Sequence, residues 1–210
     1  MSSDTEVTTE TKPAETKPAE TKPAETKPAA KPAAKPAAKP AAKPAELPAF
    51  EKSISDKIVE KFGDKIEVEF VKENRVGIKV NRDNIHDVAE FIRDGLNYDH
   101  VESVSGVDYP QDKEIEVVYH IGSYSDSSLA KQLLVLATRA QREENPIPGK
   151  DATKLPTLRD IFYSVEFHER EVFEMFGVYF TGHPDNRRLL LPEDWADLPP
   201  LRKDFAIKGR

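Results

Sequence analysis

The sequence predicts an α+β fold: a single mixed sheet-and-helix domain that ends in a helix and an extended tail. Two segments, 53–62 and 84–93, carry apolar residues at the three- and four-residue spacing of an amphipathic helix. Others, among them 65–71 and 76–80, alternate apolar and polar residues as half-buried strands do. The order helix, strand, strand, helix, strand, strand is typical of α+β layer packing and not of a regular βαβ alternation.

Composition excludes several functions before any motif is considered. The chain has 210 residues, a formal net charge of -7 and no cysteine. It therefore cannot carry a disulfide scaffold, a thiolate zinc site or cysteine-ligated iron–sulfur clusters, and a redox role on this chain alone is not expected. No apolar run approaches the roughly 18 residues that span a bilayer. The polar, acidic start argues against a signal peptide, so the expected location is the cytosol.

Residues 1–48 are predicted to form a disordered Lys-Pro-Ala repeat arm. From Thr11 the sequence repeats Thr-Lys-Pro-Ala-Glu, and from about Lys31 it repeats Lys-Pro-Ala-Ala. Such frequent proline removes the hydrogen bonds of helices and strands, and the arm has almost no aromatic or β-branched apolar residues to bury. Evenly spaced lysines can contact nucleic-acid phosphates, but here many alternate with glutamate and the rest of the chain is acidic. No nucleic-acid partner is expected, although a nucleic-acid-binding protein is kept as the outside alternative.

Residues 49–150 are predicted to form the α+β scaffold. Gly63 is expected to end the first helix and Gly95 the second, which Asn84 or Asp83 would cap. The strands 65–71 and 76–80 are close enough along the chain to form a hairpin.

The second half of the scaffold continues the strand pattern. Two more strands are predicted at 101–109 and 114–121, whereas the apolar run 129–138 fits a buried strand or a helix, with a strand favoured. The scaffold contains no glycine-rich phosphate loop, nucleophile elbow or paired-histidine metal spacing. It is therefore predicted to be structural.

The segment 151–210 is different, because charged residues occur among its apolar ones. Thr157 is expected to cap a short helix, and a longer helix is predicted over 164–176, ended by Gly177. Glu169 falls among the apolar residues of this helix, where an unpaired carboxylate would cost several kcal/mol. It needs an arginine, a backbone amide or a partner chain. A structural ion pair is favoured, with a subunit contact and an active-site acid as the alternatives.

No metal or catalytic site is predicted on this chain. His168 and Glu169 begin a His-Glu-x-x-His metalloprotease motif, but Val172 stands where the second histidine is required. A free-standing enzyme that used Glu169, Glu171 or His183 as acid and base would also need a nucleophile, a metal cage or a phosphate loop, and no such motif accompanies them.

The tail beyond Gly177 is predicted to be a docking strap, centred on residues 183–205. Four prolines keep it out of regular structure, yet it is rich in leucine and its arginines are clustered. Arginine and aromatic residues dominate the energetics of protein interfaces. The residues expected to bind a partner are Glu169, Arg170, Glu171, His183, Arg187, Arg188, Trp195, Arg202, Lys203, Asp204 and Phe205.

Three ordered stretches of the segment 151–210 also resemble a known family. They are Glu169-Arg-Glu-Val-Phe-Glu-Met-Phe-Gly-Val, then Gly182-His-Pro-Asp-Asn-Arg-Arg-Leu-Leu, then Leu201-Arg-Lys-Asp-Phe. Together they are similar to the signature of the 30 kDa subunit, the C-type subunit, of respiratory complex I and its relatives. The match spans only the last part of the chain, but its three parts occur in the same order as in the family.

The resemblance implies a place in the peripheral arm of a proton-translocating NADH:quinone oxidoreductase. In that family the 30 kDa protein holds no cofactor, and NADH, FMN, iron–sulfur clusters and quinone belong to the complex. It is a structural partner of the D-type subunit, which helps to shape the quinone site, and of neighbouring peripheral-arm subunits. This implies a protein on the cytoplasmic face of the cell membrane, attached only through the complex. The strap is then expected to be mobile in the free chain and ordered on the D-type subunit.

The electron donor stays open. The stretch Leu190-Leu-Pro-Glu-Asp-Trp is similar to short forms of the 30 kDa protein in complexes that oxidise ferredoxin or the reduced deazaflavin F420H2. NADH is the default donor by resemblance alone. A ferredoxin- or F420H2-dependent complex and a membrane-bound hydrogenase are the alternatives.

Overall fold

The structure, a computed structural model, describes residues 48–207, which belong to one compact unit. Nearly all of the predicted arm lies outside the described residues. The helices are α1 (Ala49–Phe62), α2 (Ile85–Leu96) and α3 (Val165–Phe176). The strands are β1 (Ile66–Lys72), β2 (Arg75–Val80), β3 (His100–Tyr109), β4 (Glu114–Gly122), β5 (Leu133–Gln141), β6 (Lys154–Pro156) and β7 (Tyr179–Thr181).

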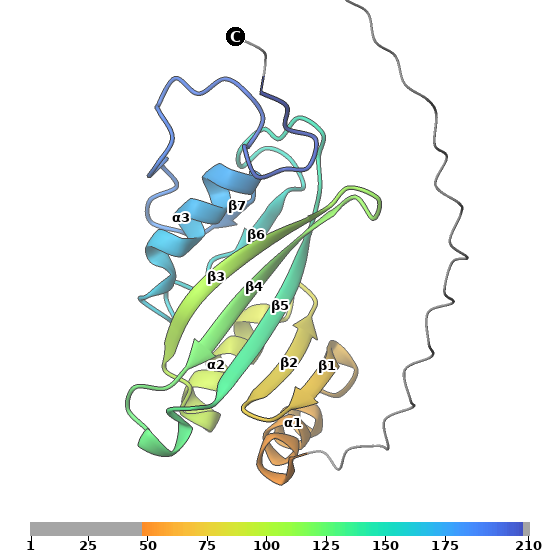
Figure 1. Cartoon of the computed structure of the whole chain (residues 1–210), viewed down its shortest axis with the longest axis vertical. Helices are drawn as coiled ribbons and strands as arrows, with labels where there is room; N and C mark the ends of the chain where they lie inside the picture. Colours follow the sequence, from red (N-terminus) through yellow and green to blue (C-terminus); the bar gives the residue numbers. More distant parts are fainter. Residues whose placement is uncertain (1–47, 208–210) are drawn as a thin grey trace, which may run out of the picture. The chain divides into compact units, whose positions relative to one another are not determined.

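A five-stranded mixed sheet forms the centre of the fold, with strand order β1-β2-β5-β4-β3 (Figure 1). β2 and β5 are parallel, and the other neighbours are antiparallel. The short strands β6 and β7 form a separate parallel pair. The predicted α+β class is confirmed, and the hairpin of β1 and β2 is present as expected.

The hydrophobic core lies on one face of the sheet. β4 and β5 turn Tyr119 and Leu136 to this face in register with each other, and both are fully buried. α2, which lies behind the sheet in Figure 1, contributes a buried stripe at helical spacing. α3 packs on β3, where a Cβ at Gly106 would come within 2.5 Å of the Phe176 ring. Glycine is thus needed there for the close approach.

Several predicted boundaries are confirmed and others shift. Gly63 ends α1 with φ 50°, but α1 begins at Ala49, earlier than predicted. α2 runs through Gly95 and ends before Asn97, which takes the left-handed conformation at φ 59°, so the predicted stop at Gly95 was wrong. The ambiguous run 129–138 is a strand, as favoured, over Leu133–Gln141.

The elements that carry the candidate site follow the prediction in part. α3 ends at Gly177, with φ 83°, as expected. The short helix predicted after Thr157 is only a turn, in which Leu158 accepts the N–H groups of Ile161 and Phe162. Thr157 still caps this turn by accepting the Arg159 N–H at 3.1 Å. Residues 182–207 contain no helix or strand, as their prolines predict.

Candidate subunit interface on α3 and the strap

Glu169 is fully buried in α3 and is satisfied by hydrogen bonds. Its carboxylate accepts the Tyr119 hydroxyl at 3.1 Å, the Leu158 N–H at 2.9 Å and the Thr157 hydroxyl. Burial raises the pKa of Glu169 to about 7, against the opposite effect of these three hydrogen bonds. The predicted ion pair with an arginine is corrected, because the backbone amide and two hydroxyls take its place.

His183 lies on the other side of this carboxylate, with Nε2 4.0 Å from Oε2 of Glu169. Its Nε2 is 3.1 Å from the carbonyl oxygen of Glu166, and its Nδ1 accepts the N–H of Asp185 at 3.0 Å. Both bonds form together only when the ring is neutral and carries its proton on Nε2. His183 therefore joins α3 to the first turn of the strap.

Arg170 holds the strap against α3 by its backbone. Its guanidinium donates to the carbonyl oxygens of Arg187 and Arg188, both at 3.0 Å, and lies 3.5 Å from the carboxylate of Asp185. The fork geometry of arginine suits two neighbouring acceptors. The sequence predicts Arg170 to bind a partner, whereas in the structure it bonds to this chain's own strap through the carbonyl groups of Arg187 and Arg188.

Glu174 also holds the strap, although it was not predicted from the sequence. Its carboxylate accepts the consecutive backbone N–H groups of Leu189, Leu190 and Leu191 at 2.9 to 3.0 Å, and the residue is only 4% exposed. The sequence feature that could have identified Glu174 is its position four residues after Arg170, on the same face of the helix. The contact leaves Leu189 and Leu190 with exposed side chains.

The turn after these leucines is held by Arg188. Its guanidinium donates to the carbonyl oxygens of Pro192, Glu193 and Trp195 at 2.7 to 3.0 Å. The ring of Trp195 lies 6.0 Å from that of Phe205. Arg188, Trp195 and Phe205 thus organise the strap itself.

The end of the strap is tied to the scaffold by a second charged cluster. Arg202, 2% exposed, donates to the carbonyl oxygens of Phe176, at 2.6 Å, and Glu143. Asp108 pairs with Arg142 at 2.6 Å and accepts the N–H of Lys203 at 2.8 Å.

Arg142 also holds the carboxylate of Asp204 at 2.7 Å. Although burial opposes it, the hydrogen bond from Arg142 lowers the pKa of Asp108. Asp108 and Arg142 were not predicted to belong to this cluster, since both lie far from the tail along the chain.

The predicted partner-binding residues therefore divide into three groups by burial. Glu169, His183 and Arg202 lie inside this chain's own fold. Glu171, Arg187, Lys203 and Asp204 are exposed, and Arg170, Arg188, Trp195 and Phe205 are partly exposed. The sequence predicts a strap that is mobile without a partner, whereas the structure shows it bonded to α3 and to the scaffold.

These bonds present an apolar surface that we call the α3–strap face, defined by Tyr163, Phe167, Leu189 and Leu190. Phe167 lies in the first turn of α3, and Tyr163 lies four residues earlier, in the turn that precedes the helix. Their side chains are 74% and 58% exposed, and Leu190 is 62% exposed. The Arg170 guanidinium, which binds the strap, lies 5.9 Å from the centre of the Phe167 ring. Exposed apolar side chains on neighbouring segments can form an interaction site.

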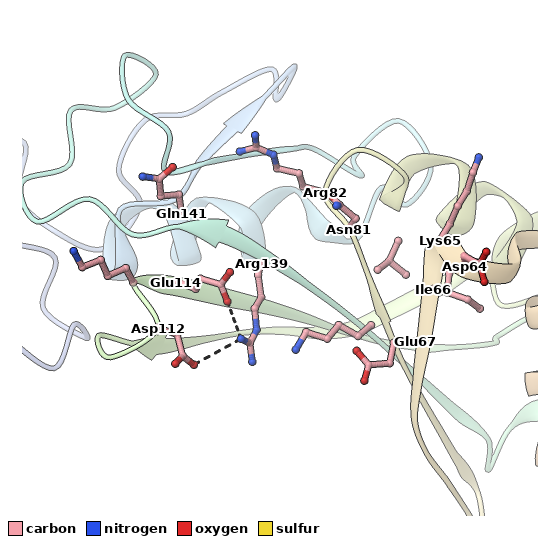
Figure 2. A pocket seen from close by; sticks show the side chains of 13 residues that line it. Asp64, Lys65, Ile66, Glu67, Asn81, Arg82, Asp112, Glu114, Arg139 and Gln141 are labelled. Carbon is pink, nitrogen blue, oxygen red and sulfur yellow. Dashed lines mark hydrogen bonds and ion pairs between the residues drawn. The ribbon is translucent and has the colours of Figure 1, made fainter.

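A cavity of about 820 Å³ lies on the other face of the sheet, near the ends of β2 and β5 (Figure 2). Its lining mixes basic and acidic side chains. Arg139 pairs with Glu114 at 2.7 Å and lies 3.8 Å from Asp112, as the dashed lines in Figure 2 show. Arg139 is therefore engaged by two acidic residues of the same cavity.

Two further features bear on function. Within residues 48–207 no group of three or more acidic or histidine side chains is arranged to hold a metal ion. In the same part of the chain no helix combines the length and the apolar character needed to cross a membrane.

Comparison with known proteins assigns the chain to a family. Residues 78–210 match the model of the respiratory-chain NADH dehydrogenase 30 kDa subunit. The C subunit of the NADH-quinone oxidoreductase of Chlorobium phaeobacteroides is 35% identical over 156 residues, which is 73% of this chain and 87% of that protein. The C subunit of the F420H2 dehydrogenase of Methanosarcina mazei is 36% identical over 131 residues, covering 62% and 75% of the two chains.

Two other relatives are a protein of known structure and a longer protein that combines a C and a D subunit. A chain of the archaeal membrane-bound sulfane sulfur reductase superposes with a TM-score of 0.59 at 30% identity, covering 74% of this chain and 85% of that one. The C/D subunit of the NADH-quinone oxidoreductase of Phocaeicola vulgatus is 34% identical over 128 residues, 61% of this chain and 22% of that longer protein. The matched region includes all of α3 and the strap, so the chain belongs to the family of the respiratory-chain NADH dehydrogenase 30 kDa subunit.

Proposed function

We propose that this chain is a cofactor-free structural subunit of the peripheral arm of a complex-I-type NADH-quinone oxidoreductase. In such a complex it would support electron transfer to quinone that is coupled to proton translocation. The observation that carries the proposal is the family match, which extends from Ile78 in β2 through α3 and the strap. The chemistry would belong to the other subunits, because the titratable groups of this site are used to fasten the strap.

The partner we propose is the D-type subunit, bound at the α3–strap face. The fused C/D relative supports this choice, since it joins a region like this chain to a second one in a single polypeptide. The face has the composition of an interface core, with aromatic and leucine side chains beside arginine. Its backbone is already held by Arg170 and Glu174, so binding would require little ordering of the strap.

A second candidate differs only in the electron donor. The Methanosarcina mazei relative is named as part of an F420H2 dehydrogenase, and the structural relative is an archaeal respiratory complex. These similarities favour an F420H2-dependent or related complex as the alternative. In either case we propose that the chain reaches the cytoplasmic face of the membrane only through its partners.

The test is to purify the native membrane complex through a tag on this chain and to identify the proteins that accompany it. We expect a D-type subunit in equal amount, and quinone reduction by one donor when NADH, F420H2 and reduced ferredoxin are compared. NADH oxidation would support the first candidate and F420H2 oxidation the second. Recovery of the chain alone from membranes and cytosol would contradict both.

A further inference from the structure

The first turn of the strap depends on a neutral histidine. The imidazole of His183 is fully buried between α3 and the strap. Its Nδ1 accepts the Asp185 N–H at 3.0 Å. Its Nε2 donates to the carbonyl oxygen of Glu166 at 3.1 Å. A second proton on the ring can only bind to Nδ1, where it would face the N–H of Asp185. Two donors cannot share that position, so protonation must break the turn.

We propose that His183 is a proton-operated latch, which holds the strap on α3 when its ring is neutral and releases it when the ring is protonated. The element it controls begins at Asp185. The carboxylate of Asp185 accepts the backbone N–H and the guanidinium of Arg187 and lies 3.5 Å from Arg170. Loss of the turn would therefore remove one of the groups that Arg170 holds. The latch operates in the free chain and does not depend on the partner proposed above.

The charged groups around His183 favour release of the strap over a stable ion pair between the protonated ring and a neighbouring carboxylate. Oε2 of Glu169 in α3 lies 4.0 Å from Nε2, and Tyr119 of β4 donates to the other oxygen of that carboxylate. Because burial raises the pKa of Glu169 to about 7, this carboxyl is mostly protonated in mildly acidic solution and offers an imidazolium no counter-charge. The Asp185 carboxylate is already engaged by two arginines. A buried imidazolium without a free counter-ion is costly, so the turn opens instead.

Two substitutions separate the two hydrogen bonds of the ring. In His183→Asn the amide oxygen takes the place of Nδ1 and can accept the Asp185 N–H as in an Asx-turn, without a titrating group. In His183→Gln a donor remains near the Glu166 carbonyl oxygen, but the acceptor for Asp185 is lost. Comparing the two variants therefore separates the effect of the hydrogen bond from the Asp185 N–H to Nδ1 from the effect of the packing of the ring.

The experiment is amide hydrogen exchange of the full chain between about pH 8 and about pH 5.5, corrected for intrinsic rates. If opening takes up one proton, protection of the Asp185 amide should fall about tenfold per pH unit in the acidic range. His183→Asn should remove this dependence, and His183→Gln should leave the amide weakly protected at every pH. Amides of β4 and β5 serve as the reference in each variant.

Three results would overturn the latch. One is constant protection of the Asp185 amide in the wild type, and another is the same pH dependence in His183→Asn. The third is loss of protection at Leu189 to Leu191 while Asp185 stays protected, which would assign the change to Glu174. If a variant fails to fold, the NMR signals of the ring nitrogens of wild-type His183 provide the test. Protonation of the ring without any loss of protection at the Asp185 amide would also contradict the proposal.

Discussion

Glu174 accepts the backbone N–H of Leu190 with both carboxylate oxygens, at 2.9 and 3.0 Å. The same carboxylate accepts the N–H groups of the residues on either side, so one buried side chain fixes three consecutive peptide groups. A backbone segment of this kind has no strand partner to satisfy it. Glu174 thus allows an irregular strap to present leucine side chains outward in a defined arrangement.

Removal of this carboxylate should loosen the strap without unfolding the domain. We expect Glu174→Ala to lower the free energy of unfolding by about 2 kcal/mol, since hydrogen bonds to charged groups contribute roughly 1.5–3 kcal/mol. Hydrogen exchange should show lost protection at Leu189 to Leu191 at neutral pH. Glu171→Ala, an exposed glutamate of the same helix, is the control and should change neither quantity. Retained protection in Glu174→Ala would contradict the role given to this carboxylate.

The buried carboxyl of Glu169 should make stability depend on pH. Its pKa is raised from 4.5 to about 7 in the folded chain, so the native state binds a proton that the unfolded state has already lost. The stability of the wild type relative to Glu169→Gln should therefore be highest below about pH 4.5 and fall as the pH rises to about 7, by at most about 3 kcal/mol. Urea unfolding of both proteins across this range measures the difference. A difference that stays constant would show that the carboxylate is ionised throughout.

The α3–strap face should be required for assembly and not for folding. We expect Leu190→Asp to reduce the amount of the D-type subunit recovered with this chain at least tenfold, because a charge in an apolar interface core must be desolvated without a partner. The matched control is Val59→Asp, which changes an exposed apolar residue of α1. Melting temperatures should be similar for both variants and the wild type. Normal recovery of the D-type subunit with Leu190→Asp would place the docking site elsewhere.

The cluster of Asp108 and Arg142 should be a major determinant of stability. Both side chains are buried, with 1% and 7% exposed. Asp108→Ala leaves the buried Arg142 with only the partly exposed Asp204 as its counter-ion and removes the acceptor of the Lys203 N–H, so it should cost about 3 kcal/mol in chemical unfolding. The double variant Asp108→Leu with Arg142→Met should be less destabilised than the single one, because neither charge remains. A single variant that loses under about 1 kcal/mol would show that the pair is dispensable.

Several features of the protein could be predicted from sequence because they depend on neighbours a few residues away. Gly63 and Gly177 end their helices since glycine takes the left-handed conformation at little cost. Alternation predicted the hairpin of β1 and β2, and the ordered signature of α3 and the tail predicted the family. The prolines of the tail predicted its irregular backbone.

Only the tertiary structure decided how the polar groups of the site are satisfied. The donors to Glu169 come from Tyr119 and Thr157, which reach it only because β4 and the turn before α3 meet there. Glu174 and Arg202 resemble surface or interface charges in the sequence, yet each is buried against backbone groups far away along the chain. Local spacing reports which side of a helix a residue occupies, but the partner of a buried charge depends on strand order and on the path of the tail. The parallel pairing of β2 with β5, across more than fifty intervening residues, was undetermined for the same reason.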